Sequence, residues 1–76
     1  MNNARRKQLQ ELSEQIEEIR DILEGLKDEE ESCRDNMPEN MQNSERYEAA
    51  GEAIDSMESA LSSLEEAASY IEDAQA

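Results

Sequence analysis

The chain has 76 residues, of which 21 are acidic and 7 are basic, so its formal net charge is −14. A charge this negative argues against nucleic-acid phosphate and anionic lipid as direct partners and favours a basic protein surface. The chain has no histidine and Cys33 is its single cysteine, which excludes an internal disulfide, a Cys/His nucleophile pair and the usual zinc ligand sets.

The remaining bulk properties predict a cytoplasmic protein. A lone thiol without a disulfide framework suits a reducing compartment. No apolar run approaches the ~18 residues that a membrane-spanning helix needs, and residues 1–20 contain no hydrophobic segment typical of a signal peptide.

The first predicted element is a helix over residues 3–34, capped by Asn2 or Asn3. Its apolar residues recur with alternating spacings of three and four, the heptad pattern of a helix that packs along one stripe. With Leu9 lettered as position a, the a and d positions are Leu9, Leu12, Ile16, Ile19, Leu23, Leu26, Glu30 and Cys33.

Three cations, Arg5, Arg6 and Lys7, fall in the first turns of this helix, where the helix dipole disfavours positive charge. An antiparallel partner helix would bring Glu72 and Asp73 alongside them, so we expect these acids to pair with the cations. The alternative is that the three cations contact nucleic acid.

A loop is predicted at residues 35–43, because Pro38 pushes the residue before it out of the helical region. Met37 and Met41 either cap the open end of the helix pair or contact a partner. Ser44 is a suitable cap for a second helix over residues 44–74. The a and d positions of that helix are Tyr47, Ala50, Ile54, Met57, Leu61, Leu64, Ala68 and Ile71.

The flanking heptad positions predict how the two helices pair. Position e carries Arg20 and Lys27 on the first helix and Glu58 and Glu65 on the second. In an antiparallel pair the e positions face each other, so opposite charges meet. The fold class is therefore all-α, a single antiparallel two-helix coiled-coil hairpin spanning residues 1–76.

A lone hairpin of this length has one layer of side chains and little core. Position g of the second helix is a row of small residues that lets another helix approach, or that serves helix propensity alone. We expect a two-fold homodimer forming a four-helix bundle. The predicted interface consists of Ile22, Ala53, Ala60, Ala67 and Ala74.

The loop residues 35–42, the following residues 44–48 and the opening residues 3–7 resemble small acidic helical proteins of phages, prophages and mobile elements of Gram-positive bacteria. The resemblance implies a protein that binds a host protein and inhibits or modulates it. It implies no catalytic or binding residue by itself.

The outer face of the first helix carries carboxylates one turn apart, which can imitate a phosphate backbone and compete for a nucleic-acid site on a basic host protein. Together with the resemblance, this predicts a protein-binding inhibitor of a host defence protein, an anti-CRISPR or other anti-defence protein. An exposed tyrosine is a suitable binding anchor. The candidate partner-binding residues are Glu14, Glu17, Glu18, Asp21, Glu24, Asp28 and Tyr70.

Two alternatives stay open. The acidic residues also fit an ordinary solvated coiled-coil exterior, and the chain also fits a self-assembling structural protein without a host target. An enzyme is not expected, because catalytic carboxylates need distinct environments and these acids are repetitive, apart from Glu30 at a packing position. Asp28, Glu30 and Ser32 lack the glycine of a calcium loop. No metal or cofactor is expected.

Overall fold

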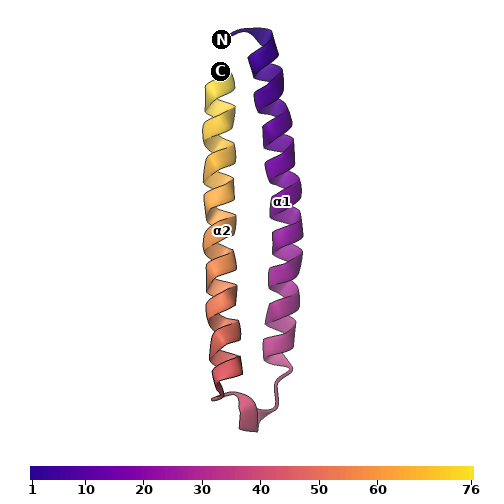
Figure 1. Ribbon diagram of the computed structural model, residues 1–76, viewed down its shortest axis with the longest axis vertical. Helices are drawn as coiled ribbons and strands as arrows, with labels where there is room; N and C mark the ends of the chain where they lie inside the picture. Colours follow the sequence, from indigo (N-terminus) through magenta and orange to yellow (C-terminus); the bar gives the residue numbers. More distant parts are fainter.

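The computed structural model describes residues 1–76 as two long helices joined by a short helical turn (Figure 1). Helix α1 spans Asn3–Asp35, the 3₁₀ turn η1 spans Glu39–Met41, and helix α2 spans Glu45–Gln75. The helices run antiparallel along a rod with extents of 60 × 14 × 12 Å. Both termini lie at one end of the rod and the loop lies at the other, which confirms the predicted hairpin (Figure 1).

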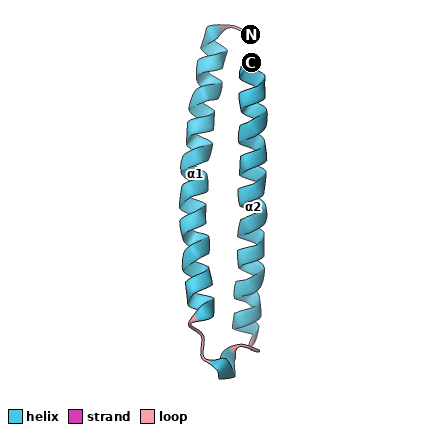
Figure 2. Cartoon of the chain, turned by 180° about the vertical axis from the view of Figure 1, so that it is seen from behind, coloured by secondary structure: helices cyan, strands magenta, loops and turns pink.

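Local sequence signals set the ends of both helices. The Asn2 side chain accepts a hydrogen bond from the backbone N–H of Arg5 at 2.8 Å, which caps α1. The Ser44 hydroxyl accepts from the N–H of Tyr47 at 3.3 Å and donates to the carbonyl of Met41 at 2.6 Å. Irregular backbone is therefore confined to the ends of the rod (Figure 2).

Helix α2 packs with the face that the heptad predicts. All eight of its a and d residues are at least half-buried, from Tyr47 near the loop to Ile71 near the terminal end. Ala50 and Ile54 are the most deeply buried, with 4% and 8% of their surface exposed.

Helix α1 packs with a different face from the predicted one. Its a residues are half-buried, but the d residues Leu12, Ile19 and Leu26 are 46%, 52% and 52% exposed, and Cys33 is exposed. The e positions are half-buried instead. The residues of this a/e face are Leu9, Ser13, Ile16, Arg20, Leu23, Lys27, Glu30 and Arg34.

The rotation of α1 has a physical reason. At about 100° per residue, positions a and e lie about 40° apart on a helix, so they form one edge as readily as a and d do. The aliphatic stems of Arg20 and Lys27 can cover the apolar surface of α2 while their charged ends stay in water. The e positions therefore contribute both packing and charge.

The core of the hairpin is very small. Only Ala50 and Ile54 of the 76 residues are buried, and every other contact residue keeps part of its surface in water. A single layer of side chains between two helices leaves one side of each helix uncovered.

Neither helix contains a stretch long and apolar enough to cross a membrane.

Candidate functional site

One flank of the hairpin is polar and is formed by the e positions of both helices. Arg20 lies 3.7 Å from Glu65, and Lys27 lies 4.0 Å from Glu58, as the charge pattern predicts. Lys27 also lies 3.8 Å from Glu31 on its own helix. Pairs this exposed contribute only about 0.2–1 kcal/mol each, so they select the antiparallel orientation more than they stabilise it.

The same ion pairs define the offset between the helices. One heptad further toward the loop, the offset places Arg34 opposite Gly51. One heptad toward the termini, it places Ser13 opposite Glu72, and both of these residues line a groove on the polar flank that is described below. A further heptad step puts Arg6 beyond Gln75, the last residue of α2.

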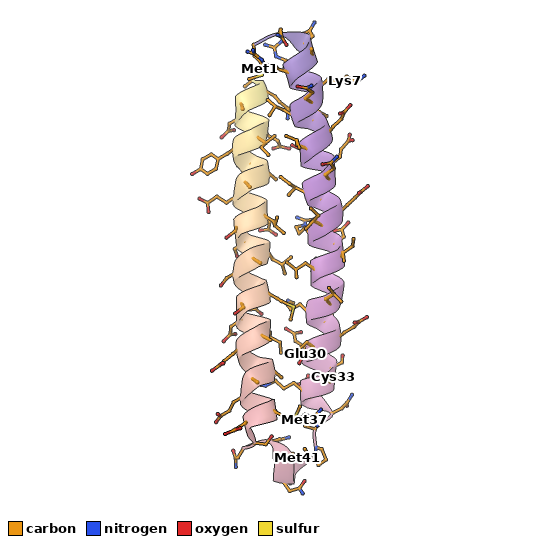
Figure 3. The ribbon with its side chains drawn as sticks, viewed as in Figure 1. Met1, Lys7, Glu30, Cys33, Met37 and Met41 are labelled. Atoms are coloured by element: carbon orange, nitrogen blue, oxygen red, sulfur yellow. The ribbon has the colours of Figure 1, made fainter.

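The basic cluster of Arg5, Arg6 and Lys7 consequently makes no ion pair, and the predicted pairing with Glu72 and Asp73 is wrong. Arg6 only donates a long hydrogen bond of 3.5 Å to Asn3. Lys7 points away from α2 at the terminal end of the rod (Figure 3). The cause is the offset between the helices, which sets Glu72 beside Ser13 rather than beside Arg6.

At the loop end, Arg34 packs against Tyr47 and Gly51 of α2, a contact that the sequence patterns did not indicate. Its guanidinium carbon lies 3.9 Å from the centre of the Tyr47 ring, and its Nε donates to the Tyr47 carbonyl at 3.2 Å. A Cβ atom at Gly51 would come within 2.9 Å of the Arg34 Nη2. Gly51 therefore provides the room that Arg34 occupies.

Replacing the two glycines by alanine is expected to give different results. Gly25→Ala should raise the free energy of unfolding by about 1 kcal/mol, because alanine has the higher helix propensity and the new methyl group would meet nothing within 4 Å beyond its chain neighbours and the local helix backbone. Gly51→Ala should give a net change near zero, because displacing Arg34 from Tyr47 offsets the gain in helix propensity by about 0.5–1 kcal/mol. Urea denaturation followed by circular dichroism measures both.

An Arg34→Ala background is the control for this pair. There Gly51→Ala should recover the same gain of about 1 kcal/mol as Gly25→Ala, since no guanidinium remains to displace. Equal stabilisation by both glycine replacements in the unmodified chain would contradict the role given to Arg34.

A shallow groove of about 290 Å³ runs along the polar flank near the terminal end. Its walls include the candidate residues Glu14 and Glu17 from α1, with Glu65 and Glu72 from α2. The Ser13 hydroxyl oxygen and the Arg20 Nε are buried there without a hydrogen-bond partner. The groove is open and polar, and only one of its lining residues, Ala68, is hydrophobic.

The predicted partner-binding carboxylates form an exposed surface of α1, which we call the acidic face. All of its members are exposed, and only Asp21 takes part in an ion pair, at 3.8 Å from Arg20. Tyr70 is also well exposed but lies on α2, so the structure does not bring it together with these acids. The acidic face consists of Glu14, Glu17, Glu18, Asp21, Glu24 and Asp28.

The opposite flank of the hairpin is apolar. The d and g positions of α1 form a row that we call the apolar edge: Leu12, Ile19, Ile22 and Leu26, each between 46% and 66% exposed. Beside it, Ala53, Ala60 and Ala74 of α2 are exposed and Ala67 is half-buried. Of the apolar edge, only Ile22 was among the predicted interface residues, because the heptad assigned the others to the hairpin's own core.

Other parts of the molecule carry no further site. Met37 and Met41 are half-buried at the loop end (Figure 3), and Glu30 is half-buried on the a/e face. No cluster of three or more Cys, Asp or Glu residues is arranged to hold a metal ion.

No protein-family model, curated protein or solved structure matches this chain. The surfaces of the hairpin are therefore the basis for its proposed function.

Proposed function

We propose that the hairpin is a protein-binding module that presents the acidic face of α1 to a basic surface of its partner, where it imitates nucleic acid. The observation that carries this proposal is the density of exposed carboxylates on this face, of which only Asp21 has an ion-pair partner. Six of them lie exposed between residues 14 and 28, a length of about 21 Å along the helix axis. Six charges are separated by five intervals, so the mean axial separation is about 4.2 Å, comparable with the 3.4 Å between phosphates along one strand of DNA.

The placement of the cations supports the same function. Arg20 and Lys27 are engaged on the polar flank, and Arg34 is stacked on Tyr47. The other cations of α1 belong to the basic cluster at the terminal end. The electrostatic potential along the middle of α1 is therefore strongly negative. This potential steers a positively charged partner toward this part of the rod.

The resemblance to phage and mobile-element proteins points to a cytoplasmic partner in a bacterial host. A defence protein that binds nucleic acid, such as a CRISPR effector, has the basic channel that an acidic rod could occupy. In this proposal the hairpin inhibits such a protein by competing with its nucleic acid.

A second candidate function is structural self-assembly, and a separate observation favours it. Only two residues are buried in the single hairpin, and the apolar edge has no partner within the chain. A homodimer that forms a four-helix bundle would cover this edge. Such a dimer is compatible with the first function, because the acidic face and the apolar edge lie on different sides of α1.

Charge reversal tests the acidic face. The triple variant Glu17→Lys, Asp21→Lys and Glu24→Lys should weaken binding to the protein partner at least 100-fold, because it replaces attraction by repulsion at the contact. The control triple Glu52→Lys, Asp55→Lys and Glu66→Lys changes the net charge equally at exposed positions of α2 and should retain binding.

The measurement uses immobilised hairpin, a bacterial lysate and a double-stranded DNA competitor, followed by titration of the captured protein. DNA should release the captured protein from the unmodified hairpin. Equal loss of binding with both triple variants, or no effect of the first triple, would show that the acidic face is not the binding surface.

A further inference from the structure

We propose that a second copy of this chain docks antiparallel on the apolar edge of α1, with Ile19 and Ile22 of both copies at the centre. This inference rests on the homodimer of the proposed function, and it specifies which face of which helix makes the contact and in which direction.

Helix α1 carries a second heptad stripe beside the one that faces α2. The spacing along this stripe again alternates three and four, and its members other than Gln15, Glu29 and Cys33 are the half-exposed aliphatic residues of the apolar edge. A helix with two adjacent stripes can pack against two other helices at once, as each helix of a four-helix bundle does. The full stripe is Leu12, Gln15, Ile19, Ile22, Leu26, Glu29 and Cys33.

The centre of this stripe is complementary to a second copy of itself. The stripe consists of positions d and g of α1. In an antiparallel pair, the d positions of one copy lie opposite the g positions of the other. Ile19 then lies opposite the second copy's Ile22, and Ile22 lies opposite the second copy's Ile19. The same offset sets Leu26 opposite Gln15 and Leu12 opposite Glu29. The layers in which two aliphatic residues meet therefore lie at the middle of the contact, and each outer layer pairs a leucine with a polar residue.

The area that such a contact would bury also supports the dimer. The rod is 60 Å long. A contact strip about 10 Å wide along it covers about 600 Å² on each copy, or about 1,200 Å² in total. That reaches the lower end of the range found for stable protein interfaces. The strip would bury the aliphatic side chains that the single hairpin leaves half in water.

Charge decides the direction of the second copy. The basic cluster at the terminal end has no ion pair within the chain, whereas the loop end carries the exposed acids Glu29, Asp35 and Glu39. An antiparallel dimer brings the basic cluster of each copy beside the acidic loop end of the other. A parallel dimer would place the two basic clusters together, and like charges repel.

A designed cross-link tests this geometry. With Ile19 opposite Ile22, Gln8 lies opposite the second copy's Cys33. Within one chain these two residues are 25 positions apart on α1, or about 37 Å, so they cannot form an internal disulfide. In a glutathione redox buffer, Gln8→Cys should give a covalent dimer whose disulfide maps to positions 8 and 33 by peptide mass spectrometry.

The unmodified chain is the matched control. Its two Cys33 residues lie about 37 Å apart in the antiparallel dimer, so it should stay without a cross-link in the same buffer. A Cys33–Cys33 dimer of the unmodified chain would overturn the proposal in favour of a parallel arrangement. Failure of Gln8→Cys to cross-link would overturn it as well.

A second variant keeps the test independent of disulfide chemistry. The double variant Ile19→Asp with Ile22→Asp should raise the dissociation constant of the dimer at least 100-fold, as measured by sedimentation equilibrium. The helical circular dichroism signal at high concentration reports whether this variant still folds. Ser59→Asp with Ser63→Asp adds the same charge at exposed positions of α2 and should leave the dimer intact. Equal dimerisation of both variants would overturn the proposal.

The two proposals fail separately. If the cross-link forms but reversal of the acidic face leaves partner binding unchanged, the dimer stands and the acidic face is not the binding surface. If partner binding depends on the acidic face but no cross-link forms, the binding function stands and the antiparallel dimer is wrong.

Discussion

Ile54→Ala is expected to lower the free energy of unfolding by about 2–3 kcal/mol, the largest effect of any replacement of a side chain by alanine in this chain. Ile54 is the one large side chain that is buried, with 8% of its surface exposed. Removing three buried carbon atoms loses their transfer free energy and leaves a gap, although two helices can partly close it. A domain of this length has a total stability of roughly 4–11 kcal/mol, so a large share would be lost.

Urea and thermal denaturation measure this effect, with the midpoint temperature falling by roughly 10–20 °C. Two other substitutions calibrate it. Ile54→Val removes one methyl group and should cost about 1 kcal/mol. Ile71→Ala removes the same atoms as Ile54→Ala from a half-buried position near the end of α2 and should cost less. If Ile71→Ala costs as much as Ile54→Ala, the core is not centred where the structure places it.

The thermal stability of the chain is expected to depend strongly on its concentration. For a dimer that unfolds to two separate chains, each tenfold increase in concentration adds about 1.4 kcal/mol to the stability of the dimer. Between micromolar and millimolar chain, the midpoint temperature should therefore rise by more than about 10 °C. Circular dichroism at a series of concentrations measures this rise.

Salt should strengthen the proposed dimer and weaken binding to the proposed basic partner. Each copy carries a net charge of −14, so two copies repel each other overall, and ions screen that repulsion. Between 0.1 M and 1 M salt the Debye length falls from about 10 Å to about 3 Å. A midpoint temperature independent of both salt and concentration would show that the hairpin is stable as a monomer, contrary to the proposed dimer.

Much of the fold could be predicted from local signals. Asn2 and Ser44 cap the two helices through hydrogen bonds to N–H groups three residues ahead. Pro38 lies in the break between them. These signals act over a few residues, so they can be recognised without any knowledge of tertiary contacts. The opposite charges at the e positions were enough to predict that the helices run antiparallel, and the ion pairs of Arg20 and Lys27 bear this out.

The candidate surfaces were only partly predictable. The heptad pattern identified the carboxylates of the acidic face as outward-facing, because exposure on that side of α1 follows from the period alone. It assigned Leu12, Ile19 and Leu26 to the core, and the structure leaves them half-exposed. The sequence did contain a signal for the a/e face, which is the regular placement of basic residues at position e. Long basic side chains at such spacing also fit the edge of a contact face, and the structure half-buries them.

The order of the amino acids is enough to predict two capped helices, the break between them, their antiparallel direction and the acidic face, because each follows from periodicity, capping or charge. The rotation of α1 about its axis and the offset between the two helices become visible only when the helices are packed together. Those two quantities depend on how Arg34 fits against Gly51 and Tyr47 and on which acid lies opposite Arg20. They are relations between residues far apart in the chain, and they leave the apolar edge uncovered and the basic cluster unpaired.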